Sequence, residues 1–307
     1  MTRSYEDSPD PAQSAVTVFA PAKVNFILRV LDRRSDGFHN LWTVMQTVGL
    51  EDTVTIRRTS RHTEIRLQCD SHSLSVDQTN LVCRAAAAVL AQVQRTVGLD
   101  IQLAKRIPMG AGLGGGSSDA AATILGINRL LNLGWTVRQM AEVGQSLGSD
   151  VPFFFHAPTA VVAGRGEQVQ PVQVTDPRWV VLVNPGFPVE TKWAYQQLST
   201  TRQGVRPLSD RCAQLQLHGR ITWDDLSSVA SNDFEAPVFG THPVLHQIKS
   251  DLLAQGAEFA LLSGSGATVF GVFKQEVGAR QAAGSFHGRS ELKVFVVQTC
   301  SAPLRVE

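Results

Sequence analysis

Apolar and polar side chains alternate along residues 16–31, and this period of two predicts a long β-strand. Lys23 and Asn25 share one face of that strand, opposite Val24 and Phe26. Similar patterns predict further strands at residues 42–48, 52–57, 63–68, 99–104, 159–163, 167–172, 179–183, 258–262, 268–273 and 292–298. The stretch 179–183 is continuously apolar, which is typical of a buried strand.

Helical patterns lie between these strands. They predict helices at residues 80–95, 117–132, 136–147, 190–199, 243–255 and 275–284. Thr136 and Gln139 form a capping box at the start of the helix 136–147. The segment between 199 and 243 is expected to consist of polar loops. Strand clusters mixed with helices predict an α+β or α/β fold.

A turn signal in the sequence divides the chain into two predicted domains. Asp176-Pro177 is a turn signal, and we place a domain boundary there, between residues 16–175 and 176–307. Residues 1–15 are polar and include Glu6, Asp7 and Asp10, so they lack the apolar centre of a signal peptide. We expect them to form a disordered tail on a cytoplasmic protein.

Composition narrows the class of protein. The formal net charge is +1, from 28 Lys and Arg against 27 Asp and Glu, so no basic footprint indicates nucleic acid or an anionic membrane. No apolar run approaches the roughly 20 residues of a transmembrane helix. The cysteines are far apart and form no C-x-x-C pair, so neither a zinc site nor a disulfide framework is expected. Nothing in the sequence decides the oligomeric state.

The strongest chemical signal is a glycine-rich loop between a predicted strand and a predicted helix. Its residues are Pro108, Met109, Gly110, Ala111, Gly112, Leu113, Gly114, Gly115, Gly116, Ser117 and Ser118. Glycines let the backbone approach an anion closely, and the following helix directs unpaired N–H groups toward it. The glycine density exceeds what a tight turn needs. The loop therefore predicts a phosphate site.

Several known phosphate loops do not fit this segment. A Walker A loop counted from Gly110 would need a lysine where Gly116 stands. Gly110, Gly112 and Gly115 satisfy G-x-G-x-x-G, but a helix rather than a strand follows the first helix, so the dinucleotide context is wrong. The other motifs of protein kinases are absent.

The loop instead resembles the nucleotide loop of the GHMP kinases, a superfamily of small-molecule kinases. Two more segments resemble motifs of that superfamily, one at residues 21–26 (PAKVNF) and one at 262–270 (LSGSGATVF). The resemblance implies a two-lobed fold, with an N-terminal domain like the second domain of ribosomal protein S5 and a C-terminal ferredoxin-like domain. It also implies ATP and Mg²⁺ as cofactors. No carboxylate of the sequence is clearly placed to bind the metal.

Two further segments narrow the resemblance. Residues 33–41 (RRSDGFHNL) and 148–153 (GSDVPF) resemble the branch of the superfamily that phosphorylates the 2-hydroxyl of a cytidine-diphosphate-linked methylerythritol in the non-mevalonate route to isoprenoids. That branch usually has D-G-Y-H where this chain has Phe38. A flat ring survives there, while a phenol hydrogen bond is lost.

The resemblance also implies residue roles. Lys23 and Asp150 are expected to be catalytic, because phosphoryl transfer needs a base for the attacking hydroxyl and charge beside it. Asn25, Phe38, His39 and Tyr195 are expected to bind the acceptor, with Phe38 and Tyr195 stacking on cytosine and Trp193 as the rival of Tyr195. Thr191, Asp119 and Thr268 are expected to help line the site, and no role is assigned to them.

Other classes of function stay open at this level. A kinase for homoserine or phosphomevalonate is the first rival, and the D-G-F-H segment argues against it. A nucleotide-binding regulator without catalysis is the second, and the presence of both Lys23 and Asp150 argues against that. A dinucleotide-dependent oxidoreductase is a distant third. An ADP-release assay across candidate acceptors separates the kinases from the others.

Overall fold

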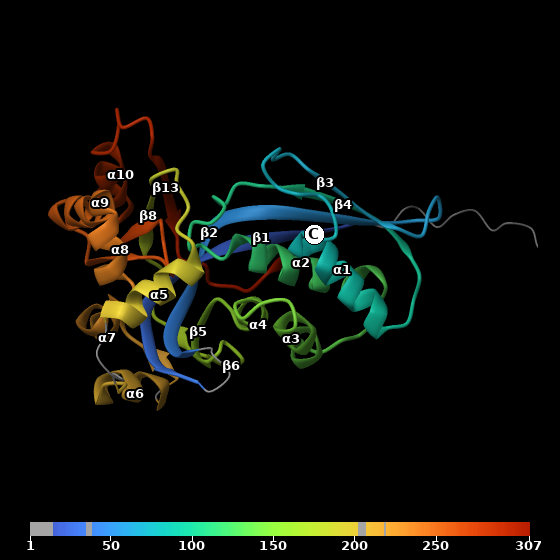
Figure 1. Cartoon of the computed structure of the whole chain (residues 1–307), viewed down its shortest axis with the longest axis horizontal. Coiled ribbons are helices and arrows are strands. Elements are labelled where there is room, and N and C mark those ends of the chain that lie inside the picture. The colour runs from blue at the N-terminus through green and yellow to red at the C-terminus, as the bar shows by residue number, and fades with distance from the viewer. Residues whose placement is uncertain (1–14, 35–38, 202–206, 218) are drawn as a thin grey trace, which may run out of the picture.

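The computed structural model describes residues 15–34, 39–201, 207–217 and 219–307. Two lobes lie side by side, with the long strands β1 and β2 running between them (Figure 1). The strands are β1 (Ala15–Arg33), β2 (His39–Thr59), β3 (Ile65–Cys69), β4 (Gly98–Ala104), β5 (Thr159–Gly164), β6 (Gln168–Pro171), β7 (Gln173–Val174), β8 (Trp179–Asn184), β9 (Arg220–Ile221), β10 (Ser231–Asn232), β11 (Phe259–Leu262), β12 (Val269–Phe273), β13 (Lys293–Gln298) and β14 (Arg305–Val306).

The helices alternate with these strands along the chain. They are α1 (Leu81–Gln92), α2 (Gly115–Leu130), α3 (Val137–Gln145), α4 (Val151–His156), α5 (Thr191–Thr201), α6 (Asp210–Leu217), α7 (Trp223–Val229), α8 (Glu235–Thr241), α9 (Pro243–Ala254) and α10 (Glu276–Gly284). Within the described part of the chain, no helix combines the length and apolar character needed to cross a bilayer.

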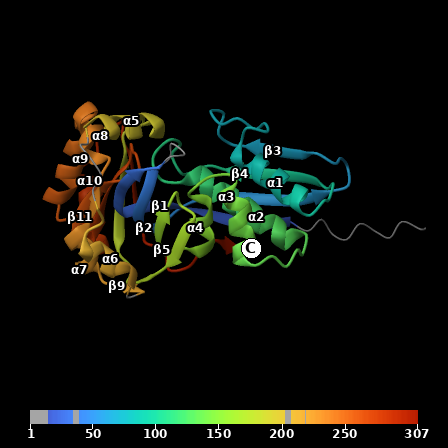
Figure 2. The same cartoon turned by 60° about the horizontal axis from the view of Figure 1, so that its bottom comes forward.

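The first sheet has the strand order β10-β1-β2-β4-β3, and β5 and β14 pair with β2 and β1 respectively. Helices α1 to α4 gather on one side of it, which the turned view shows (Figure 2). The core between α2 and the sheet contains Val18, Val54 and Ile56 from the strands and Ile124 and Ile127 from the helix. This packing holds α2 against β1 and β2.

The second sheet has the order β11-β12-β8-β13. Val180 and Leu182 of β8 face a core that includes Phe26 of β1, while Val181 and Val183 face the core under the helices α9 and α10. Because side chains of a strand alternate between faces, the apolar run at 179–183 serves both cores. The lobes are thus joined through β1, which also pairs with β10 and β14.

The mixed α+β fold expected from the sequence is confirmed, since helices alternate with the strands of two larger sheets. The predicted strands 42–48 and 52–57 are wrong as separate elements, because both belong to β2. The polar loops expected between 199 and 243 are also wrong, since α6, α7 and α8 lie there. These helices have only 7 or 8 residues, too few to display a clear period.

Several other predictions can be placed. The capping box of Thr136 and Gln139 is confirmed at the start of α3. Of the expected tail, residues 1–14 lie outside the described residues, and Ala15 opens β1. The domain boundary near Asp176 stays a prediction. Beyond Asp176 the chain returns to the first sheet, where β10 and β14 pair with β1.

Candidate functional site

The glycine-rich loop lies at the start of α2, between the two lobes. Gly110, Gly112 and Gly114 have φ values of +60°, +76° and +70°, a region that L side chains rarely adopt. Gly114 is the N-cap of α2, and the first intrahelical bond runs from the Ser118 N–H to the Gly114 carbonyl at 2.9 Å. The N–H groups at the start of α2 therefore precede the hydrogen-bond ladder and can receive an anion.

Contacts from distant segments hold this loop in place. The Lys23 N–H of β1 donates to the Leu113 carbonyl at 2.9 Å, and the Thr268 N–H donates to the Ala111 carbonyl at 3.1 Å. The Ser263 hydroxyl donates to the Gly112 carbonyl at 3.0 Å. A side chain at Gly112 would run into the Ser263 carbonyl. The three motifs at residues 21–26, 108–118 and 262–270 therefore converge on one place.

Lys23 and Asp150 meet beside this loop. The Lys23 Nζ lies 3.6 Å from the Asp150 Oδ2 and donates to the Asn25 Oδ1 at 2.7 Å. The Asn25 amide in turn donates to the Thr43 hydroxyl at 2.9 Å. Lys23 is 4% exposed, whereas the Asp150 side chain is 34% exposed. The buried lysine is thus held by a chain of partners, and the carboxylate remains accessible to a ligand.

The position of Asp150 leaves its carboxylate available. Asp150 is the N-cap residue of α4, but its side chain makes no capping hydrogen bond. The apolar residues that follow it, Val151, Phe153 and Phe154, are fully buried and anchor α4 in the core. A carboxylate that neither caps its helix nor is buried in the core can accept a proton from a bound hydroxyl.

One cavity of about 670 Å³ joins the loop to this pair. Its wall includes Lys23, Asn25, Thr43, Asn80, Lys105, the loop residues 108–117, Asp119, Asp150, Thr191, Tyr195, Phe234, Gly264 and Ser265. The predicted residues Thr191 and Asp119 are therefore on the wall, and Thr268 is not part of it. Ser118 is fully buried behind the loop.

The acceptor residues predicted from the sequence are only partly brought together. The rings of Tyr195 and His39 stack at 4.9 Å, and Tyr195 also meets the edge of Phe234 at 4.8 Å. Tyr195 lines the cavity, whereas the Trp193 ring lies 5.8 Å from His242, away from it. Phe38 lies outside the described residues. The geometry thus favours Tyr195 over Trp193, and both base-stacking roles stay predictions.

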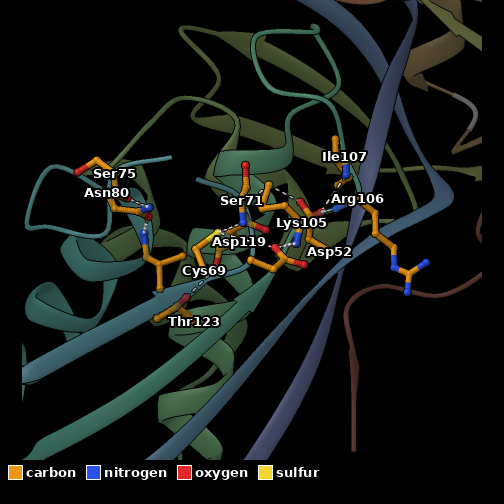
Figure 3. A network of polar contacts seen from close by, with 12 residues as sticks. Asp52, Cys69, Ser71, Ser75, Asn80, Lys105, Arg106, Ile107, Asp119 and Thr123 are labelled. Carbon is orange, nitrogen blue, oxygen red and sulfur yellow. Dashed lines mark hydrogen bonds and ion pairs between the residues drawn. The ribbon is translucent and has the colours of Figure 1, made fainter. Parts of the chain in front are cut away.

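A network that the sequence reasoning missed lies under the loop. Lys105 contacts Asp52, and its Nζ lies 2.7 Å from the Asp119 Oδ2 (Figure 3). Asp52 is fully buried, and burial raises the pKa of Asp119 although Lys105 opposes that rise. Asp52 falls on the buried face of β2 with Val54 and Ile56, and a carboxylate on an apolar face needs a partner. That signal was available in the sequence.

Asn232 is a second residue that the sequence reasoning missed. Its amide donates to the carbonyls of Leu262 and Gly264 at 2.8 and 2.7 Å. It thereby fixes the glycine turn whose Gly264 borders Lys23. A lone asparagine far along the chain offers no sequence pattern that would reveal this contact.

A glycine-rich loop at the start of a helix and a lysine–aspartate pair, both on the wall of one cavity, are the parts that a small-molecule kinase needs. Two family models agree with this class: the GHMP kinase N-terminal domain matches residues 80–157, and the GHMP kinase C-terminal domain matches residues 217–289. The chain belongs to the GHMP kinases and, within them, to the family of the 4-diphosphocytidyl-2-C-methyl-D-erythritol kinases.

The relatives that support this statement are similar over most of their length. The 4-diphosphocytidyl-2-C-methyl-D-erythritol kinase of Geobacter metallireducens is 42% identical over 92% of this chain and 98% of its own. The enzyme of the same name from Heliobacterium modesticaldum is 39% identical over 92% and 95%. A crystal structure of 4-(cytidine 5'-diphospho)-2C-methyl-D-erythritol kinase has a TM-score of 0.75 and 31% identity, covering 93% of this chain and 100% of that chain.

A more distant structure shows the fold alone. The homoserine kinase of Cytophaga hutchinsonii has a TM-score of 0.72 at 20% identity, over 99% of this chain and 100% of that chain. The backbone arrangement is therefore shared by kinases of different acceptors.

Proposed function

We propose that this chain transfers the γ-phosphate of ATP to the 2-hydroxyl of 4-diphosphocytidyl-2-C-methyl-D-erythritol, giving the 2-phosphate and ADP. This reaction serves isoprenoid precursor synthesis by the non-mevalonate route. The observation that carries the proposal is the Lys23–Asp150 pair, at 3.6 Å, on the wall of the cavity that the glycine loop also lines. The relatives that print this activity in their names support it.

The proposed mechanism assigns one task to each part of the site. The N–H groups at the start of α2 bind the phosphates of ATP and neutralise part of their charge. The Asp150 Oδ2 accepts the proton of the attacking hydroxyl, and the Lys23 ammonium beside it stabilises the negative charge that develops on that oxygen. The acceptor then lies between Asp150 and Tyr195, which both line the cavity.

Mg²⁺ fits this site as an ion carried by the nucleotide. Among the described residues there is no cluster of three or more His, Cys, Asp or Glu that could hold a metal by itself. Mg²⁺ is usually bound through one or two protein oxygens together with substrate phosphates, so such a cluster is not required. The Ser117 hydroxyl, half-buried on the cavity wall, would be a ligand. When bound, Mg²⁺ neutralises phosphate charge.

An ADP-release assay tests the proposed function. We expect turnover with the cytidine-linked methylerythritol and none with homoserine, mevalonate or phosphomevalonate. Turnover should fall with the uridine analogue, because uracil has an acceptor where cytosine has its amine donor and would leave a buried polar group unpaired. Tight ATP binding without turnover of any acceptor would favour the non-catalytic regulator instead.

Replacing Tyr195 tests the acceptor end of the cavity. Tyr195→Ala should raise KM for the acceptor by about 1–2 kcal/mol, roughly 5- to 30-fold, because stacking on the base is lost. KM for ATP should stay unchanged. Trp193→Ala is the matched control, since the Trp193 ring faces His242 rather than the cavity. An effect on acceptor KM in Trp193→Ala but not in Tyr195→Ala would contradict the assignment.

The pH dependence of kcat/KM reports on Lys23. Burial lowers the pKa of Lys23 from its ordinary value of 10.5, and the nearby Asp150 only partly reverses that effect. Because the mechanism needs the charged ammonium, kcat/KM should decline at a pH below 10.5 as Lys23 loses its proton. Tyr195 does not account for this decline, because burial raises the pKa of its phenol.

The Lys23→Arg variant shows whether Lys23 or another group causes the alkaline decline in kcat/KM. Arginine stays protonated throughout this range, so the alkaline decline should vanish from the profile even if the rate is lower at every pH. An unchanged alkaline decline in Lys23→Arg would assign it to another group.

A further inference from the structure

The cavity wall has a second cation besides Lys23. Among the described residues that line the cavity, Lys23 and Lys105 are the lysines, and no arginine or histidine joins them. Lys23 stands at the acceptor end, beside Asp150 and Asn25. Lys105 lies at the beginning of α2, next to Gly115, whereas Lys23 lies next to Gly114.

The Lys105 ammonium lies against the first residue of α2. A Cβ atom built on Gly115 would lie 3.3 Å from the Lys105 Nζ, with Ile107 as its other close neighbour. The absence of a side chain at Gly115 therefore leaves the ammonium next to the N–H groups that precede the helix ladder. Positive charge and unpaired N–H groups at one place are what a phosphate oxygen requires.

Two carboxylates hold this ammonium in a fixed position. Asp52 of β2 contacts the Lys105 Nζ, and the Asp119 Oδ2 of α2 lies 2.7 Å from it (Figure 3). Asp52 also accepts the N–H groups of Arg106 and Ile107, at 2.5 and 2.9 Å, so it binds the chain that leads into the loop. The side chain is therefore ordered before any ligand arrives.

The ammonium retains one donor. A lysine ammonium has three N–H groups, and Asp52 and Asp119 occupy two of them. The Lys105 side chain is 7% exposed and belongs to the cavity wall, so the third N–H group can reach a ligand in the cavity. Burial alone would lower the pKa of Lys105, but Asp119 and Asp52 outweigh it and raise that pKa, so the ammonium stays charged.

We propose that Lys105 binds the phosphate chain of the nucleotide. This lysine precedes the glycine loop in the sequence and is not part of the loop. This proposal rests on the proposed function, because it takes ATP as the ligand of the loop. In a Walker A loop the lysine follows the glycines, and here Gly116 occupies that position. Lys105 supplies the missing charge from three residues before Pro108. Asp52 and Asp119 are positioning residues that act through it.

The alternative is that the three charges only stabilise the fold. Lys105→Met alone does not distinguish the two, because it leaves two buried carboxylates unpaired and is expected to unfold the protein. A variant with Asp52→Asn, Lys105→Met and Asp119→Asn together removes all three charges and leaves none unpaired. Asparagine at position 52 keeps an oxygen that can accept the N–H groups of Arg106 and Ile107, and no buried charge is left uncompensated, so this triple variant should stay folded by circular dichroism.

Calorimetry of nucleotide binding, with Mg²⁺ and without acceptor, is the test. We expect the triple variant to bind ADP and ATP roughly 10- to 100-fold more weakly than the wild type, because a charged hydrogen bond is lost. Its affinity for adenosine, which has no phosphate, should not change. The matched control is the double variant Asp251→Asn, Arg289→Gln, which removes a partly buried ion pair whose partners do not line the cavity. It should bind ADP within about threefold of the wild type, well inside one tenfold step of affinity.

The possible results separate the two proposals. Wild-type affinity for ADP in a folded triple variant would overturn the role of Lys105 and leave the proposed function intact. An equal loss of adenosine and ADP affinity would also overturn it, since the effect would not depend on phosphate. A wild-type chain that binds neither ADP nor ATP would overturn the proposed function and this inference with it.

Discussion

Asp150→Asn is expected to lower kcat by a factor on the order of 10²–10⁴, since the amide has the shape of the carboxylate but cannot accept the proton of the hydroxyl. Affinity for ATP should change little, because Asp150 lies at the Lys23 end of the cavity and not among the loop residues. Steady-state kinetics with both substrates and calorimetry with ATP measure the two effects separately.

A matched substitution shows whether the loss belongs to the site. Asp224→Asn changes an exposed carboxylate in the first turn of α7 and should leave kcat unchanged. If Asp150→Asn keeps more than about a tenth of the wild-type kcat, the carboxylate is not the proton acceptor. The reaction would then proceed without a protein base, through positioning and phosphate neutralisation alone.

Gly114→Ala is expected to lower kcat by a factor on the order of 10², although it adds a single methyl group to a residue that has no chemical role of its own. A Cβ atom at Gly114 would lie 2.9 Å from Cγ and 3.1 Å from Cε of Lys23. The lysine must therefore shift, and a displacement of about 1 Å in a catalytic group can cost that much. The reaction rate and the nucleotide affinity should be measured on the same folded preparation.

Gly134→Ala supplies the control for backbone strain. Gly134 has φ +68°, close to the +70° of Gly114, and a Cβ atom there would meet nothing within 4 Å. Both variants should therefore lose similar stability from the left-handed conformation, about 1–2 kcal/mol. Only Gly114→Ala should lose activity. An equal loss of activity in both would mean that general destabilisation, rather than contact with Lys23, is the cause.

Much of the fold could be predicted because it depends on local patterns. The period of two along β1 and the continuous apolar run of β8 are visible in the sequence, as is the capping box of α3. The errors arose where the pattern was short or interrupted. β2 continues through Leu50 and Glu51, where the apolar alternation breaks, because β1 pairs with it both before and after that point, β5 before it and β4 after it.

The candidate site could be predicted in part for the same reason. The glycine loop is contiguous, so its residues needed no tertiary information to be recognised as one unit. Lys23 and Asp150 are 127 positions apart, and only the resemblance to known kinases placed them together. The ion pairs of Lys105 with Asp52 and Asp119 join three elements and leave no contiguous pattern.

The sequence by itself determined the class of fold, the glycine-rich loop and the residue types available for catalysis. These follow from neighbouring residues, whose spacing sets the period of a helix or strand and the backbone freedom of a turn. Only the tertiary structure decided that Lys105 stands beside the start of α2, and that Tyr195 rather than Trp193 lines the cavity. The reason is physical: which side chains meet in a cavity depends on strand pairing and helix packing between distant segments, and a linear pattern does not encode those distances.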